Sequence, residues 1–211
     1  MQIIDQNNWN RKEHFEFFNS YDDPFFGITT EVDCTIAYDH SKAKNVSFFA
    51  FYLHRSILAV NRVKELRCRI VDGDVVLFDE VHAASTIGRP DGTFGFSFIP
   101  FSSDFHLFDS HLKNEIKIVN ETTGLRANSD AYRKDVIHYS TIPWTKFSSL
   151  SHPKKFNSKD TAPKITFGQT FISKKKRLLP VSIHAHHGLA DGFHLSKSLE
   201  EFQKLLDQPS R

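Results

Sequence analysis

Residues 182–194 read Ser182-Ile183-His184-Ala185-His186-His187-Gly188-Leu189-Ala190-Asp191-Gly192-Phe193-His194. Residues 178–186 before the turn favour a strand. Residues 193–206 carry leucines and a phenylalanine at helical spacing, which predicts a closing helix with one apolar face. The stretch is therefore expected to join a strand to the last helix through a glycine-containing turn. It holds four histidines at that junction, which makes it the first candidate for chemistry.

Two interpretations of these histidines involve no catalysis. His184 and His186 share a strand face and Asp191 offers an oxygen, which would suit a metal ion, although no further ligand motif stands elsewhere in the sequence. In the second interpretation the histidine rings are hydrogen-bonded to neighbouring groups and have a structural role. Asp191 then caps the last helix, with Gly192 in the turn. Most histidines in proteins are neither ligands nor bases.

A third interpretation is general-base catalysis. An imidazole titrates near neutral pH and can take a proton from a hydroxyl nucleophile. A carboxylate four residues later can fix the local backbone and orient the ring. His187 and Asp191 alone form a weak pattern, but His-His-x-x-x-Asp-Gly between a strand and a helix is far more specific.

Composition excludes several classes of protein. The 211 residues include 27 basic and 25 acidic side chains, a net charge of +2, and 21 phenylalanines against five tyrosines and two tryptophans. This aromatic content and charge balance argue against disorder, and a nearly neutral chain gives no electrostatic reason to expect nucleic acid as a partner. No repeat or linker divides the sequence, so we expect one domain over residues 1–211.

Localisation is predicted from what the sequence lacks. Cys34 and Cys68 are too few for a disulfide scaffold and have no metal-ligand spacing. The first residues lack the pattern of a signal peptide, and the longest apolar run, residues 48–53, is too short to span a bilayer. We therefore expect a cytoplasmic protein with no membrane partner.

Hydrophobic periodicity predicts alternating helices and strands. Helices are expected over residues 9–18, 47–65, 104–120 and 193–206, and strands over residues 25–37, 93–101, 135–139, 164–173 and 178–186. A hairpin is expected from residues 67–71 and 75–78, where Gly73 supplies the positive φ of a tight turn. Strict βαβ alternation is missing, so the class is α/β or α+β with a mixed sheet.

At this point the sequence resembles a known family. Residues 186–194 are similar to the active-site signature of the chloramphenicol acetyltransferases, part of a wider set of CoA-dependent acyltransferases that includes the dihydrolipoyl acyltransferase cores. Other segments fit the family in the same order. They are Trp9-Asn10-Arg11-Lys12-Glu13-His14-Phe15-Glu16-Phe17, Ala59-Val60-Asn61 with Glu65-Leu66-Arg67, Phe101-Ser102-Ser103-Asp104, Ser140-Thr141-Ile142-Pro143-Trp144 and Ala162-Pro163-Lys164-Ile165-Thr166. The resemblance covers nearly the whole chain and implies a two-layer sandwich in which helices cover a mixed sheet.

The resemblance also implies a mechanism. His187 would be the general base, removing the proton from an acceptor hydroxyl that attacks acetyl-CoA directly in a ternary complex. Ser140 stands where the family places the hydroxyl that stabilises the oxyanion, and Thr166 where a residue assists through a bound water. Asp191 would form an ion pair with Arg11 and so hold the His187 loop.

Binding residues and partners follow from the same resemblance. Phe17, Phe18, Phe94 and Phe96 would line the acceptor pocket, and Trp144, Gln169 and Thr170 would lie near the co-substrate. The implied function is O-acetylation of chloramphenicol, an antibiotic-resistance activity, by a homotrimer whose sites lie between subunits, with acetyl-CoA as co-substrate and no metal. Two alternatives remain open: another small hydroxyl or amine acceptor, or an idle protein that binds a lipophilic ligand.

Four departures from the family pattern bear on the acceptor and the co-substrate. Ala190 replaces a common Cys, and Phe18 replaces a Tyr found in some members. Residues 149–161 are polar and basic where the family has apolar pocket residues, and Gln169-Thr170 replaces a Lys-Tyr pair. Residues 174–177 are basic; we interpret them as a solvated turn rather than a site for CoA phosphates.

Overall fold

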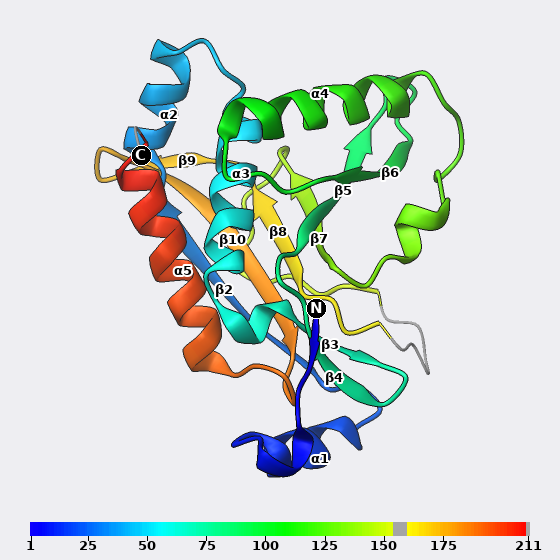
Figure 1. Cartoon of the computed structure of the whole chain (residues 1–211). Coiled ribbons are helices and arrows are strands. Elements are labelled where there is room, and N and C mark those ends of the chain that lie inside the picture. Colours follow the sequence, from blue (N-terminus) through cyan, green and yellow to red (C-terminus); the bar gives the residue numbers. More distant parts are fainter. Residues whose placement is uncertain (154–159, 210–211) are drawn as a thin grey trace.

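The computed structural model of the chain describes residues 1–153 and 160–209, and its centre is a mixed sheet of seven strands (Figure 1). The strand order is β2-β10-β8-β7-β5-β6, and the short β9 also pairs with β10. Strands β8, β7 and β5 run parallel to one another, and the other pairs are antiparallel. The bounds are β2 Phe25–Asp33, β5 His82–Gly88, β6 Phe94–Ile99, β7 Val136–Ile142, β8 Lys164–Gly168, β9 Phe171–Ser173 and β10 Lys176–His186. The predicted mixed sheet is confirmed.

Four helices form the second layer against one face of this sheet (Figure 1). They are α2 Thr35–Ala43, α3 Phe48–Asn61, α4 Phe105–Asn120 and α5 Gly192–Asp207. Helix α3 is buried along most of its length, as expected for a helix between a sheet and other helices. Alternate residues of β10, Val181, Ile183 and Ala185, belong to the core beneath these helices. The main core therefore lies between one face of the sheet and the helical layer.

The remaining elements lie at one end of the molecule. Helix α1 (Lys12–Asn19) stands apart from the other helices, near the hairpin of β3 (Cys68–Val71) and β4 (Asp74–Leu77) (Figure 1). Strand β1 (Gln2–Ile3) adds to β4 and completes a three-stranded sheet. Asp72 and Gly73 have φ angles of 51° and 96°, so the predicted hairpin turn is confirmed.

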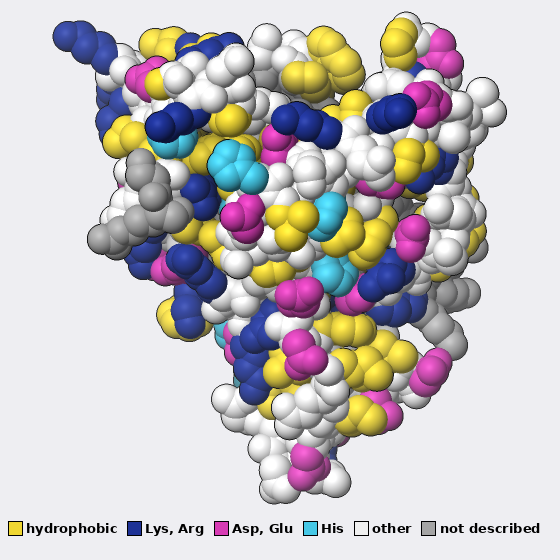
Figure 2. Space-filling view, turned by 45° about the horizontal axis from the view of Figure 1, so that its top comes forward, with side chains coloured by type: hydrophobic (Ala, Val, Ile, Leu, Met, Phe, Trp, Pro, Cys, Tyr) yellow, Lys and Arg dark blue, Asp and Glu magenta, His cyan; other side chains and the backbone are white. Residues whose placement is uncertain are grey.

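Short 3-10 turns complete the chain, at η1 (Gln6–Asn8), η2 (Lys64–Arg67) and η3 (Ser129–Tyr132). None of the helices within the described ranges has the length and apolar character needed to cross a lipid bilayer. On the face shown in Figure 2, basic and acidic side chains are interspersed.

Several predicted boundaries were wrong, and side-chain hydrogen bonds explain two of them. The strand expected to reach residue 37 ends at Asp33, because the Asp33 carboxylate accepts hydrogen bonds from the Thr35 amide and hydroxyl (3.0 and 2.6 Å) and begins α2. The helix expected to reach residue 65 ends at Asn61, whose side chain binds both backbone groups of Val81. Strand β5 was not predicted at all.

Arg69 is the largest fully buried side chain and joins the hairpin to the start of β7. Its guanidinium donates to the carbonyl oxygens of Leu66, Cys68, Lys134 and Val136 at 2.5–2.9 Å. Burial lowers the pKa of Arg69 to about 10, so the group keeps its charge at neutral pH. Backbone carbonyls thus solvate a cation in the interior.

Replacing Arg69 should therefore destabilise the fold. Arg69→Met leaves four carbonyl groups without their donor, and we expect the free energy of unfolding to fall by about 3–5 kcal/mol. Arg62→Met is the matched control, since Arg62 forms an exposed ion pair with Glu201 and should change the free energy by only about 0.5 kcal/mol. Urea titration at one protein concentration measures both. Equal stability of the two variants would contradict a stabilising role for Arg69.

Candidate active site

The turn between β10 and α5 is fixed by backbone and capping hydrogen bonds. The amides of Leu189 and Ala190 both donate to the His186 carbonyl (2.9 and 3.0 Å). The Asp191 carboxylate accepts from the Phe193 amide at 3.0 Å, and the His194 ring accepts from the Asp191 amide at 3.2 Å. Such a capping box satisfies the amides of the first helical turn, and the predicted capping role of Asp191 is confirmed.

His187 lies in this turn between two aromatic rings. Its imidazole stacks parallel to the Phe18 ring, with the centroids 3.9 Å apart, and the Phe26 ring lies 4.2 Å away on a tilted plane. Its amide donates to the Pro24 carbonyl at 2.8 Å. Atom Nδ1 is buried and has no hydrogen-bond partner among the described residues. Aromatic packing therefore orients the His187 ring.

Asp191 contacts Arg11 instead of the His187 ring. Arg11 Nη1 lies 2.7 Å from Asp191 Oδ2, and Nη2 donates to the His187 carbonyl at 3.3 Å. Burial raises the pKa of Asp191, but the hydrogen bond from Arg11 and the charges of His194 and Arg11 outweigh it and hold the pKa below its usual value. Arg11 is only 8% exposed. The ion pair thus connects the residue preceding α1 to the turn that carries His187.

The other histidines of the stretch make local contacts. His186 is buried, its Nδ1 accepts from the Gly188 amide at 3.2 Å, and burial together with the charge of His187 lowers the pKa of His186 to about 4. His184 Nε2 lies 3.0 Å from the Ser182 hydroxyl. His184 and His186, which were considered above as metal ligands, each make a hydrogen bond to a neighbouring group. This agrees with the structural interpretation of the two residues.

The face of the sheet opposite the helices carries a row of hydroxyl side chains. Ser140, Thr166, Ser182 and Thr29 are register partners on β7, β8, β10 and β2. Thr29 donates to Ser182 at 3.1 Å, whereas the hydroxyl of Thr166, a residue only 1% exposed, has no partner among residues 1–153 and 160–209. Buried hydroxyls are normally hydrogen-bonded, so Thr166 is suited to bind a water or a ligand atom.

Ser140 lies in the wall of a cavity of about 450 Å³, a size suited to a small molecule. Phe94 and Phe96 line the same cavity from β6, and their ring centroids are 6.0 Å apart. Thr166 is the register partner of Ser140 on the next strand. The structure therefore brings together one group of predicted residues, Ser140, Thr166, Phe94 and Phe96.

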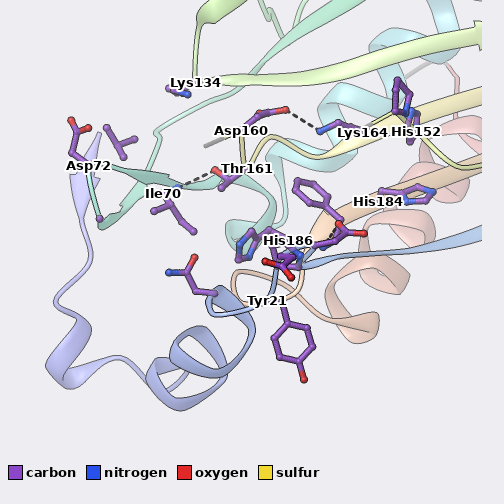
Figure 3. Close-up of a pocket in the computed structure, with 18 residues that line it drawn as sticks. Tyr21, Ile70, Asp72, Lys134, His152, Asp160, Thr161, Lys164, His184 and His186 are labelled. Atoms are coloured by element: carbon purple, nitrogen blue, oxygen red, sulfur yellow. Dashed lines mark hydrogen bonds and ion pairs between the residues drawn. The ribbon is translucent and has the colours of Figure 1, made fainter. Parts of the chain in front are cut away.

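A second cavity of about 840 Å³ lies beside the first and shares His152, Asp160 and Lys164 with it. Figure 3 shows Asp160 and Lys164 reaching toward each other, and their charged atoms lie 2.9 Å apart. Burial opposes ionisation of Asp160, but a hydrogen bond and charge from His138 and the charge of Lys164 hold its pKa well below the usual range. A charged wall thus separates the two cavities. The predicted polar segment 149–161 contributes Asp160 to this wall, and its residues 154–159 lie outside the described residues.

A second group of predicted residues gathers around His187. Arg11 and Phe18 contact it, and Asp191 forms an ion pair with Arg11. The centroid of the exposed Phe17 ring lies 5.1 Å from that of Phe18. Within the part of the chain that the structure covers, His187 does not line the cavity of Ser140, and the buried Nδ1 of its ring and the Thr166 hydroxyl have no hydrogen-bond partner. One chain therefore keeps the predicted base and the predicted oxyanion donor apart.

The three residues predicted near the co-substrate lie beyond β7 and β8. Trp144 is 81% exposed, the Gln169 amide donates to the Thr145 carbonyl at 2.8 Å, and the Thr170 hydroxyl accepts from Arg177 at 3.2 Å. Lys174 and Lys175 form the turn between β9 and β10 with left-handed φ angles of 48° and 66°, as expected for a turn.

Neither cysteine belongs to either group. Cys34 and Cys68 are buried free thiols. Burial raises the pKa of Cys34 to about 12 and that of Cys68 to about 11. Both thiols are therefore unreactive at neutral pH.

Sequence reasoning missed Phe26 and Pro24, which contact the His187 ring and amide. Phe26 reaches the ring because β2 pairs with β10 in a register that sets Phe26 opposite Ala185. The aromatic pair Phe25-Phe26 at the start of a predicted strand was the available signal, but the register could not be derived from it.

Comparisons with known proteins agree with this geometry. A family model described as "Chloramphenicol acetyltransferase" matches residues 1–203. A chloramphenicol acetyltransferase of Campylobacter coli is 30% identical over 97% of this chain and 98% of its own length. One of Proteus mirabilis is 28% identical over 98% of this chain and 94% of its own length.

Solved structures show the same relationship. One described as chloramphenicol acetyltransferase is 32% identical, superimposes with a TM-score of 0.91 and covers 97% of this chain and 99% of its own. The dihydrolipoamide acetyltransferase of Azotobacter vinelandii shares the fold, with a TM-score of 0.70 at 11% identity over 92% of this chain and 85% of its own. The chain belongs to the chloramphenicol acetyltransferase family of acyltransferases.

Proposed function

We propose that the protein transfers the acetyl group of acetyl-CoA to a hydroxyl of chloramphenicol. The observation that carries this proposal is His187, held between Phe18 and Phe26 in the family's signature turn with the Arg11–Asp191 pair behind it. Its relatives are named for this activity. In this proposal the whole chain, residues 1–211, acts as one domain in the cytoplasm, where acetyl-CoA is available, and confers antibiotic resistance.

The reaction proceeds by direct attack in a ternary complex. His187 takes the proton of the acceptor hydroxyl while its oxygen forms a bond to the thioester carbonyl carbon. Ser140 donates a hydrogen bond to the resulting oxyanion, which stabilises the transition state by several kcal/mol in order of magnitude. The carbon–sulfur bond then breaks, and the proton held by His187 passes to the departing CoA sulfur. Thr166 binds a water beside the intermediate. Its buried hydroxyl, which has no hydrogen-bond partner among the described residues, supports this role.

A second copy of the chain completes the site. Among the described residues of one chain, His187 does not line the cavity of Ser140, yet the mechanism needs both side chains at one carbonyl group. A homotrimer in which His187 of one subunit faces the Ser140 cavity of the next resolves this separation, because head-to-tail interfaces can close into a ring. Trp144, Gln169 and Thr170 bind the co-substrate in this arrangement.

The lining of the smaller cavity supports an aromatic acceptor. Phe94 and Phe96 offer ring faces that would stack on the nitrophenyl group, and Phe17 and Phe18 would cover it from the neighbouring subunit. A second candidate, another small hydroxyl or amine compound, is favoured by the charged wall of Asp160 and Lys164 in the same cavity. A charged or strongly polar acceptor would be recognised by that wall.

The first prediction from the proposed function concerns the acceptor and the general base, His187. The protein should release free CoA from acetyl-CoA when chloramphenicol is present, measured by thiol titration. His187→Ala should lower kcat by about a hundred- to ten-thousandfold, since it removes the general base, with an unchanged circular dichroism spectrum. His106→Ala, a change of an exposed histidine on α4, is the control and should keep full activity. Turnover only with a different acceptor would overturn the choice of chloramphenicol, and an active His187→Ala enzyme would overturn the mechanism.

The second prediction concerns the ion pair. Arg11→Val removes the guanidinium partner of the half-buried Asp191 carboxylate, so the free energy of unfolding should fall by about 1–3 kcal/mol. The kcat should also fall, because the His187 carbonyl loses its donor. Because the pair depresses the pKa of Asp191, its contribution to stability is present above the unfolded value near 3.8. It declines as pH falls from that value through the lower pKa of the folded state. Urea titrations at pH 7 and pH 3 should therefore show a smaller difference between variant and parent at the lower pH. A constant difference would contradict this role.

The third prediction tests the shared site. Ser140→Ala and His187→Ala should each be nearly inactive alone. After the two variants are denatured together and refolded, roughly a quarter of the interfaces should pair an intact His187 with an intact Ser140 if copies mix at random. Activity of the mixture should rise accordingly above that of either variant. Complementation that never appears, in a mixture shown by native mass spectrometry to contain mixed trimers, would refute a site between subunits.

A further inference from the structure

The outer edge of β6 is hydrogen-bonded by side chains and a loop in place of a further strand. β6 ends the strand order of the large sheet, and an edge strand normally presents unpaired backbone groups. Here the Phe96 amide donates to the Leu125 carbonyl at 2.9 Å, and the Phe96 carbonyl accepts from Arg126 Nη1 at 3.0 Å. The Phe98 amide donates to Glu115 Oε2 at 3.1 Å. The exposed edge is thereby satisfied at Phe96 and Phe98.

Glu115 and Arg126 also bind each other. Glu115 Oε2 lies 2.9 Å from Arg126 Nη1, and each side chain is only 14% exposed. One carboxylate oxygen and one guanidinium nitrogen therefore close a ring with the Phe96 carbonyl and the Phe98 amide. Arg126 has a left-handed φ of 53°, a conformation that a residue other than glycine keeps only where surrounding contacts determine it. We call Glu115 and Arg126 together the edge clamp.

The edge clamp acts on the strand that carries the aromatic wall of the smaller cavity. Phe94, Phe96 and Phe98 alternate along β6 and all three line that cavity. Side chains leave a strand nearly perpendicular to the sheet, so the plane of the backbone at Phe96 and Phe98 sets the direction of their rings. Strand β5 holds the inner edge of β6, and the edge clamp holds the outer edge.

Glu115 is separated from the cavity itself. It lies on α4 and is absent from the residues that line the cavity, whereas Arg126 lines it. The contacts through which a change at Glu115 reaches the cavity are those to Arg126 and to the backbone of β6. This makes Glu115 the informative position for a test.

We propose that Glu115 is a positioning residue for acceptor specificity, which holds β6 through Arg126 and so keeps Phe96 and Phe98 directed at the acceptor. The inference rests on the proposed function for the identity of the acceptor. The hydrogen bonds at the edge of β6 do not depend on which acceptor the protein uses. Kinetics with chloramphenicol test the acceptor, and amide hydrogen exchange tests the strand edge.

Steady-state kinetics of Glu115→Ala and Glu115→Gln test the effect on the acceptor. Loss of the hydrogen bonds to the Phe98 amide and to Arg126 should raise KM for chloramphenicol about tenfold in Glu115→Ala. KM for acetyl-CoA and kcat should stay within about twofold, because His187, Ser140 and Thr166 are untouched. Glu115→Gln keeps an oxygen that accepts from both donors and should restore most of the parent KM. Glu201→Ala, which breaks the exposed pair with Arg62, is the matched control and should change neither KM.

Amide hydrogen exchange tests the clamp without any acceptor. Exchange at Phe96 and Phe98 should be faster in Glu115→Ala than in the parent or in Glu201→Ala, since an edge strand without its partners opens locally. Unchanged exchange at both amides overturns the inference, whether or not the parent acetylates chloramphenicol. Faster exchange with an unchanged acceptor KM, or equal rises of both KM values, also overturns it, because the role would then be structural only. A parent without chloramphenicol turnover refutes the proposed function and, with it, the assignment of the acceptor.

Discussion

The structure depends on the pairing of β10 with β2 and β8. This strand places Val181, Ile183 and Ala185 in the core beneath the helices, and its alternate residues face the opposite side of the sheet. The same antiparallel register with β2 delivers Phe26 to the ring of His187 and Pro24 to its amide. Without that pairing, the turn after β10 would lose the Phe26 ring and the Pro24 carbonyl that hold His187. Core and active turn are thus consequences of one set of backbone hydrogen bonds.

The Arg11–Asp191 pair adds a connection that the sheet cannot make. It joins the start of α1, which stands apart from the other helices, to the first residues of the last helix. The Asp191 carboxylate also caps α5 by accepting from the Phe193 amide. Arg11 binds this carboxylate through Nη1 and uses Nη2 to donate to the His187 carbonyl. Three local requirements therefore meet at one side chain, and the position of His187 follows from all three.

Sequence periodicity predicted the elements whose apolar faces are strong. The helix of residues 104–120, the hairpin around Gly73 and the strand-to-helix junction after His186 all appear in the structure. Strand β5 was missed because its residues are small and weakly patterned, and only its neighbours β6 and β7 make it a strand. The predicted strand over residues 25–37 ran into the start of α2, and the rest of α2 was not predicted, because a side-chain contact of Asp33 ends β2.

The arrangement of the candidate site also could not be predicted from sequence patterns alone. Arg11, His187, Asp191, Ser140 and Thr166 were named because their motifs resemble a family, and no spacing in the sequence could have placed Ser140 beside Thr166. That neighbourhood is a matter of strand register. The edge clamp was invisible for a similar reason, since Glu115 and Arg126 are joined across a loop that carries no motif. Polar contacts between distant segments depend on tertiary geometry, which local patterns do not encode.

The buried cysteines have a consequence for chemistry that involves a thiol product. In the proposed reaction, every turnover releases free CoA, and CoA that dissolved oxygen has oxidised to its disulfide can exchange with a cysteine thiolate, giving a protein–CoA mixed disulfide and one CoA thiol. Such exchange requires a thiolate, and burial holds the pKa of Cys34 at about 12 and that of Cys68 at about 11. Neither cysteine is therefore expected to form a disulfide with the released coenzyme. The protein is expected to stay free of CoA adducts in both reducing and mildly oxidising conditions.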